Sequence, residues 1–354
     1  MKVGMFQTPF LGPERSARQV FDWAVQQAVV AEQAGFTEYW VGEHATLNWE
    51  GIPSPELVIS AVGNRTGQIR LGPLAHLLPY YHPATLAIQT AWMSQVLQGR
   101  YMLGVATGAY PSDAALRGIT DMSQNHAMMI EAIDIMQRVW KAEPFEFEGR
   151  FWKAGFPKTD PKKPYRDTRP YGGTMPMAMT GLSSPSPSIT FAATRGYLPV
   201  SVYAGNPFLR SHFETYKATS EQHGHRAERS MHRIVRDVVV ARSDAEAREL
   251  AIQGGIGRAW REYLTPTYHR FNVLQGLLHD SSVDASKVDS AYLAEHVWIV
   301  GSPETVVRKF RQWFDELGGP FGTLLIYSHD YLDNPKPWEE SMRLLAKEVA
   351  PHLG

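Results

Sequence analysis

Two stretches of this chain decide its fold: Tyr39–His44 (YWVGEH) and Leu78–Pro83 (LPYYHP). In each, an apolar segment with strand character ends in a histidine, and a helix start follows soon after. The carboxyl ends of the strands carry the chemistry in a barrel of parallel strands. We therefore expect His44 and His82 to point at one site.

Strand and helix signals alternate along the whole chain. The expected strands span residues 2–6, 38–42, 69–78, 100–106, 176–180, 198–203, 234–241 and 323–327. Eight strands alternating with helices predict an α/β protein of the (β/α)8 TIM-barrel class, although a doubly wound open sheet gives a similar alternation. We predict a single domain over residues 1–354.

Two segments break the alternation. Residues 143–173, after strand four, hold five prolines and a hairpin-like stretch at Phe145–Trp152. We interpret this segment as an excursion from the barrel because its aromatic side chains need burial. Residues 254–295, after strand seven, look irregular and predict a second excursion or a mobile lid.

The composition excludes several classes of function. Lys plus Arg is 35 and Asp plus Glu is 36, so no strong field favours a nucleic acid or an anionic membrane as partner. The chain has no cysteine, which excludes disulfides and zinc–thiolate sites and fits a cytoplasmic protein. No metal-binding motif stands out among the 13 histidines, and no apolar run of about 18 residues predicts a membrane span.

The two strand-end histidines have functional and structural explanations. A histidine can give or take a proton near neutral pH, which makes His44 a candidate acid or base. Alternatively, His44 only hydrogen-bonds a loop. For His82 the alternative is a cap of the following helix, and spacing alone favours that alternative.

Further candidate residues lie at the ends of other expected strands. Arg100–Gly108 predicts a buried strand that runs into a glycine-bearing turn, whose glycines either let the backbone approach a planar or anionic ligand or allow close packing of a strand on a helix. Gly181–Ser186 ends strand five and opens a helix, which is either a phosphate site or an ordinary serine cap. Five aromatic residues at strand ends are candidates to line a substrate space or simply to fill the core: Phe6, Tyr80, Tyr110, Tyr203 and Tyr327.

The ordered combination of these motifs resembles the luciferase-like flavin-dependent monooxygenases. The resemblance is carried by Gly35–His44, Leu71–Gly72, Leu78–Pro83 and Gly99–Tyr110, and it is densest in residues 1–115. Within the family, the chain is most similar to the branch that includes the limonene monooxygenases, through Ile69–Gly72, Leu103–Val105 and Pro111–Ala115.

The resemblance implies a TIM barrel that uses reduced FMN and O2. A separate NAD(P)H:flavin reductase would supply the reduced FMN, and a neutral apolar organic molecule would be hydroxylated or undergo Baeyer–Villiger oxidation. Aromatic pocket residues and the lack of a cationic cluster agree with such a substrate. Because family members commonly form dimers, the resemblance also implies a homodimer.

The resemblance also implies roles for individual residues. His44 would act as acid or base in the oxygen chemistry of the flavin, and His82 corresponds to the family's second strand-end histidine. A cis peptide bond not involving proline would fall near Leu74–Ala75. The flavin would contact Leu74, Ala75, Ala106, Thr107 and Tyr110, and its phosphate would bind at Gly181, Ser183, Ser184 and Ser186.

The chain departs from luciferase itself at three of these places. Ala45 stands where luciferase has a second histidine, Ala106 where it has a reactive cysteine, and Thr107 where it has a phosphate-binding arginine. Arg195 or Arg236 is a candidate to replace that arginine.

Two other functions remain open at this stage. A deazaflavin-dependent oxidoreductase on the same barrel would transfer hydride and ignore oxygen. A non-catalytic relative would bind a flavin without turnover.

Overall fold

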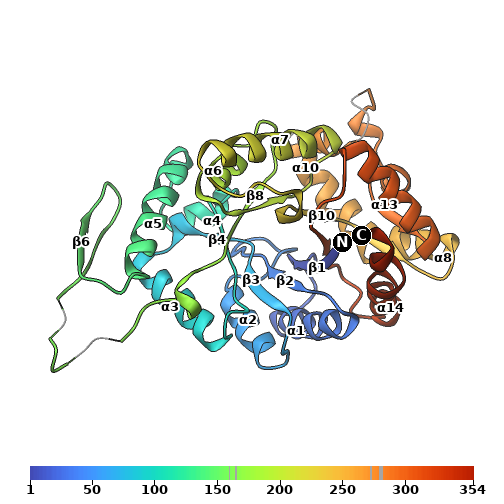
Figure 1. Cartoon of the computed structure of the whole chain (residues 1–354). Coiled ribbons are helices and arrows are strands. Elements are labelled where there is room, and N and C mark those ends of the chain that lie inside the picture. Colours follow the sequence, from blue (N-terminus) through green and yellow to red (C-terminus); the bar gives the residue numbers. More distant parts are fainter. Residues whose placement is uncertain (159, 164–165, 272, 279–281) are drawn as a thin grey trace.

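A computed structural model describes residues 1–158, 160–163, 166–271, 273–278 and 282–354. Within these residues, parallel strands form one sheet in the order β3-β2-β1-β13-β10-β9-β8-β5-β4. Helices surround this sheet (Figure 1). A bridge between Leu71 and Tyr101 links the β3 edge to the segment before β5, so the sheet closes nearly into a barrel. The predicted TIM-barrel class is confirmed, and the open-sheet alternative is wrong.

The strands agree with the predicted segments, apart from two breaks. The barrel strands are β1 (Lys2–Gln7), β2 (Glu38–Val41), β3 (Arg70–Pro73), β4 (His76–Leu77), β5 (Leu103–Ala106), β8 (Met177–Gly181), β9 (Leu198–Ser201), β10 (Arg233–Arg236) and β13 (Thr323–Tyr327). Outside the barrel lie the pair β6 (Phe145–Glu148) and β7 (Lys153–Phe156), and the pair β11 (Val238–Val240) and β12 (Ile299–Gly301).

The helices begin and end largely where capping residues predict. They are α1 (Ala17–Ala34), α2 (Pro55–Gly63), α3 (Pro83–Val96), α4 (Pro111–Ala115), α5 (Asn125–Val139), α6 (Pro187–Arg195), α7 (Asn206–Gln222), α8 (Asp244–Gln253), α9 (Gly255–Ala259), α10 (Thr265–Phe271), α11 (Leu274–Leu277), α12 (Ser290–His296), α13 (Pro303–Leu317) and α14 (Lys336–Leu344). Ser16 caps α1 through the backbone N–H of Gln19, and Gly35, with φ 106°, ends it.

The two breaks fall in segments expected to be single strands. Residues 69–78 split into β3 and β4, and the Leu74–Ala75 peptide between them is cis, as the family resemblance implies. Residues 234–241 split at Asp237, which is buried and accepts hydrogen bonds from His329 Nε2 (2.6 Å) and Trp260 Nε1 (2.8 Å). Beyond Asp237 the chain leaves the barrel, and β11 pairs with β12.

The excursion after strand four contains the predicted hairpin. Strands β6 and β7 pair antiparallel, and the hairpin projects from the side of the barrel (Figure 1). Glu131 of α5 holds its turn, because its carboxylate accepts the backbone N–H groups of Arg150, Phe151 and Trp152 at 2.9–3.0 Å. Residues 159 and 164–165 of this excursion lie outside the described residues.

The second excursion is more regular than the sequence predicts. Residues 254–295 contain α9, α10, α11 and α12 and a π-helical turn at Trp260–Leu264. Each helix is too short to show a clear apolar period, which explains why the sequence looks irregular. The segment packs the buried side chains of Trp260, Leu264 and Tyr268 against the barrel. Residues 272 and 279–281 lie outside the described residues.

A buried ion pair fills the amino-terminal end of the barrel. Arg233 Nη2 of β10 donates to Glu38 Oε1 of β2 (2.7 Å), and Trp40 Nε1 donates to the other carboxylate oxygen of Glu38 (3.0 Å). Burial opposes the charge on Glu38, but Arg233 outweighs it and lowers the pKa of Glu38. Strands β2 and β10 are not neighbours in the sheet, so this pair spans the interior.

The described part of the chain contains no candidate membrane-spanning helix. No helix there has both the length and the apolar character that crossing a bilayer requires.

Candidate active site

A cavity of about 440 Å³ lies at the carboxyl ends of the barrel strands. Phe6, Leu77, Ala106 and Thr180, at the ends of β1, β4, β5 and β8, all line it. The volume lies in the range of small-molecule sites. Most of the lining is apolar, so the few polar groups in it decide its chemistry.

His44 lies between two carboxylates at one side of this cavity. Its Nδ1 donates to Asp113 Oδ2 at 3.2 Å, and its Nε2 lies 3.3 Å from Glu50 Oε2. The ring of Tyr110 meets the imidazole edge-on at 5.1 Å between centroids. Both ring nitrogens therefore face acids, an arrangement that favours the doubly protonated imidazolium.

The electrostatics of the three groups follow from this geometry. Burial disfavours a charged His44, but Glu50 and Asp113 outweigh it and raise the pKa of His44 above its ordinary value. Burial raises the pKa of Glu50. Burial also opposes the charge on Asp113, but hydrogen bonds from His44 and Thr46 outweigh it and lower its pKa.

Asp113 is fixed by the loop that carries His44. Its Oδ1 accepts the backbone N–H groups of Ala45 (3.1 Å) and Thr46 (2.9 Å) and the hydroxyl of Thr46 (2.7 Å). Helix α4, which begins at Pro111, carries this aspartate to the end of β2. The side chain is 1% exposed, so its charge acts on His44 with little screening by water.

The second excursion supplies one wall of the site. Tyr263, in the π-helical turn, donates its hydroxyl to Glu50 Oε1 at 2.5 Å. Its ring stacks on Trp49 at 5.8 Å between centroids. Leu264, Tyr268 and Phe271 from the same segment line the cavity and add to its apolar surface.

The structure brings together eight of the residues that the sequence analysis selects for the site. The cavity is lined by Phe6, His44, Leu74, Ala75, Ala106, Thr107, Tyr110 and Tyr203. Tyr203 has φ 50°, in the left-handed region that residues with a side chain rarely adopt. Their roles in catalysis or binding stay predictions.

Seven predicted residues do not line the cavity, namely four in the turn after β8 and three elsewhere: His82, Tyr80 and Tyr327. His82 is exposed at the N-cap of α3 and makes no side-chain cap bond, so its placement does not support a catalytic role. Tyr80 lies beneath the Arg117 guanidinium, 4.8 Å from its ring centroid. Tyr327 is 2% exposed behind Tyr203, on which it stacks at 4.8 Å.

The serine turn after β8 also lies outside the cavity lining. Ser186 caps α6 by accepting the backbone N–H of Ile189 (3.3 Å), and the Ser183 hydroxyl donates to the Pro185 carbonyl (2.9 Å). Gly181 packs against Ile189, and Ser184 is exposed. Ser188, one residue inside the helix, lines the cavity instead.

Neither arginine suggested as a phosphate ligand reaches the cavity lining. Arg195 ends α6 at the opposite end of that helix from Ser186 and pairs with Asp134 at 3.4 Å. Arg236 lines a different cavity outside the barrel wall.

The sequence analysis missed several residues that line or support the site, among them Glu50, Asp113, Ser188 and Tyr268. Asp113 lies in the Pro111–Ala115 stretch that carries the family resemblance, but nothing local to that stretch indicates that it pairs with His44. It also missed His76, a buried histidine of β4 whose Nδ1 donates to Glu43 at 2.9 Å and which does not line the cavity.

Comparison with known proteins gives a consistent result. A family model described as luciferase-like monooxygenase matches residues 1–319. The 2,5-diketocamphane 1,2-monooxygenase 1 of Pseudomonas putida is 45% identical, over 100% of this chain and 99% of its own. The limonene 1,2-monooxygenase of Rhodococcus erythropolis is 26% identical, over 97% of this chain and 85% of its own.

A solved structure agrees with these relatives. It is described as a type II Baeyer–Villiger monooxygenase, the oxygenating constituent of 3,6-diketocamphane monooxygenase from Pseudomonas putida in complex with FMN. It is 40% identical, matches 100% of this chain and 99% of its own, and superposes with a TM-score of 0.97. The family resemblance drawn from the sequence is confirmed.

The two carboxylates should set the titration of His44. We predict that NMR titration of His44 gives a midpoint above the ordinary value of 6.5, and that Asp113→Asn lowers it. The asparagine keeps an oxygen for Ala45 and Thr46 but turns an NH2 group toward Nδ1, which opposes the imidazolium. An unchanged or higher midpoint in the variant would contradict the electrostatic account.

Proposed function

This chain belongs to the luciferase-like monooxygenases, and we propose that it oxidises a compact, neutral, cyclic ketone by oxygen insertion beside the carbonyl group. It is a flavin-dependent monooxygenase with FMN as its cofactor. The observation that carries the proposal is a mostly apolar cavity in which a histidine is held between two buried carboxylates.

The cavity fits the two chemical parts of FMN. Ala75, Leu77, Val105 and Ala106 provide small or apolar surface for a flat ring system. Ser188 lies near the amino terminus of α6, where the helix dipole and the serine hydroxyl favour a phosphate. When bound, reduced FMN supplies the electrons with which one atom of O2 enters the substrate and the other becomes water.

His44 holds a proton at the edge of this cavity. Because its pKa is raised, the His44 imidazole stays protonated up to a higher pH than an exposed histidine does. Asp113 fixes the ring through Nδ1, and Glu50 faces Nε2, so the proton is oriented by both neighbours. We assign His44 the role of acid or base, with Asp113 and Glu50 positioning it.

Two tyrosines are suited to contact the substrate through their rings. The rings of Tyr203 and Tyr268 meet edge-on at 4.8 Å and line the cavity. Within the described residues, their buried hydroxyl groups make no hydrogen bond of normal geometry. These hydroxyl groups are enclosed by protein, so it is the tyrosine rings, together with Leu182 and Phe271, that would contact the hydrocarbon body of the substrate.

The relatives support this substrate class and a separate source of electrons. The 45% identical relative is named for a diketocamphane, a cyclic ketone. The FMN complex is described as an oxygenating constituent, which implies another constituent. We propose that a NAD(P)H:flavin reductase supplies reduced FMN to this chain, with O2 as co-substrate.

We also infer that two copies of the chain form a homodimer through α2 and α3. Ile88, Trp92 and Val96 recur every four residues on α3 and are 52%, 49% and 53% exposed. Leu57 on α2 is 67% exposed. A monomer in solution would leave these large apolar side chains in water.

A charge on this face should separate the copies. We predict that Ile88→Glu converts a dimer to a monomer in light scattering, with the circular dichroism of the wild type retained. The matched control is Ala218→Glu on the exposed surface of α7, which lies on the other side of the barrel from α2 and α3 (Figure 1), and this variant should stay dimeric. A wild-type monomer, or a dimeric Ile88→Glu variant, would refute this interface.

The two strand-end histidines make a matched test of the site. With chemically reduced FMN, 2,5-diketocamphane and ¹⁸O2, we predict that the wild type forms a lactone carrying one ¹⁸O atom. His44→Ala should lower the yield by about 100-fold, because it removes the positioned proton. His82→Ala should stay within about two-fold, since its side chain is exposed outside the cavity.

Each alternative outcome has a definite meaning. Full yield from His44→Ala would refute the acid–base role. A large loss in His82→Ala would restore the catalytic role that the sequence predicts for that residue. An oxygenated product without new oxygen in the ring would indicate hydroxylation instead of Baeyer–Villiger oxidation.

A further inference from the structure

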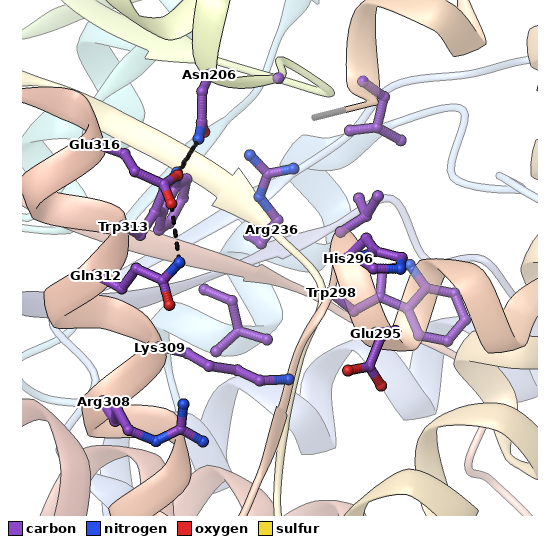
Figure 2. A pocket seen from close by; sticks show the side chains of 14 residues that line it. Asn206, Arg236, Glu295, His296, Trp298, Arg308, Lys309, Gln312, Trp313 and Glu316 are labelled. Atoms are coloured by element: carbon purple, nitrogen blue, oxygen red, sulfur yellow. Dashed lines mark hydrogen bonds between the residues drawn. The ribbon is translucent and has the colours of Figure 1, made fainter. Parts of the chain in front are cut away.

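A second cavity lies outside the barrel wall. It has a volume of about 360 Å³ and lies between β10, α13 and residues 295–299 (Figure 2). Residues Gly205, Asn206 and Leu277 complete its lining. It shares no lining residue with the cavity at the strand ends, and its size also suits a small molecule.

The cavity contains a buried arginine whose charge is favoured by the neighbouring Asp237 but which has no direct ion pair among the described residues. Arg236, at the end of β10, is 6% exposed, and its guanidinium lies 4.9 Å from the ring centroid of Trp313. Its Nη2 donates to the carbonyl of Ala204 at 2.8 Å. In the described part of the chain, Arg236 forms no ion pair and no other side-chain hydrogen bond.

The unused donors of Arg236 are open to the cavity. A guanidinium carries five N–H donors, and only one has a partner here. Some side-chain nitrogen and oxygen atoms of the protein are fully buried and have no hydrogen-bond partner, but no nitrogen of Arg236 is one of them. Burial lowers the pKa of Arg236 to about 10, so the group stays charged at neutral pH.

Two more cations line the cavity from α13. Figure 2 shows Lys309 and Arg308 on the α13 side of the cavity, with Arg236 across from them. Among the residues that the structure describes, neither forms an ion pair within 4.0 Å. Burial lowers the pKa of Lys309, which means that its charge is partly removed from water.

The two carboxylates of the cavity offset its three cations only in part, although Glu295 does favour the charge on Lys309. Glu295 pairs with Arg248 at 3.3 Å. Glu316 accepts hydrogen bonds from Asn206 (2.6 Å) and Gln312 (3.1 Å), which Figure 2 shows as dashed lines. A buried charge normally has a partner, because taking it out of water without one is costly.

We propose that this cavity binds a small organic anion through a carboxylate or phosphate group. The fork of Arg236 suits two oxygens of either group, and Lys309 supplies the second positive charge. Leu277 and Trp298 would contact the organic part of the molecule. The occupant would lie against Gly205 and Asn206, two to three residues after Tyr203 of the flavin cavity, so this site is a neighbour of the active site but separate from it.

Calorimetric titration of the chain saturated with oxidised FMN, which occupies the flavin cavity, tests this proposal. The probes are phenyl phosphate, benzoate and inorganic phosphate, each in chloride buffer at constant ionic strength. We expect saturable binding of at least one organic probe at one site per chain. Lys309→Gln should weaken it at least five-fold, and Arg236→Gln should abolish it.

Two control variants make the result specific. Lys217→Gln removes one positive charge from the exposed surface of α7 and should change the affinity less than two-fold. Ser188→Ala alters the flavin cavity and should have no effect. The side chain of Lys309 is partly exposed, so Lys309→Gln tests the site even if Arg236→Gln fails to fold.

Four results would overturn the proposal. They are no saturable binding of any probe, equal weakening by Lys309→Gln and Lys217→Gln, loss of binding in Ser188→Ala, and binding of inorganic phosphate alone. Phenyl phosphate and benzoate distinguish the two anionic groups. None of these results depends on monooxygenase turnover, so the proposed function is tested separately.

Discussion

Closure of the parallel sheet is the constraint on which the rest of the structure depends. Because β3 and β4 together join the two edges of the sheet, the carboxyl ends of the strands meet at one rim. The Glu38–Arg233 pair and the packed interior occupy the other end. Side chains that are far apart in sequence thus line one cavity.

Electrostatics then give the rim its chemistry. Asp113 and Glu50 are both buried, and each faces one nitrogen of His44, so the three groups titrate as a unit. Tyr263, a residue of the second excursion, donates a hydrogen bond to Glu50. The excursion is therefore part of the site and not only its cover. The apolar remainder of the lining strengthens these interactions by excluding water.

The sequence predicts features that depend on local pattern, and it misses those that depend on tertiary contact. The alternation of strands and helices yields the barrel, and the strand-end motif yields His44. The same motif also selects His82, which the following helix turns to the surface. Asp113 lies 69 residues from His44 in the chain, so only the folded structure reveals their contact. The short helices of residues 254–295 have too little periodicity to be seen.

The most direct test of the central claim is anaerobic titration of reduced FMN into the wild type and Ala106→Leu. Ala106 lines the rim cavity at the end of β5, and a leucine there would fill the space assigned to the flavin ring. The account predicts one flavin per wild-type chain and at least a ten-fold weaker affinity in the variant, with unchanged thermal stability. Equal affinity in both proteins would contradict it, because the flavin would then bind elsewhere.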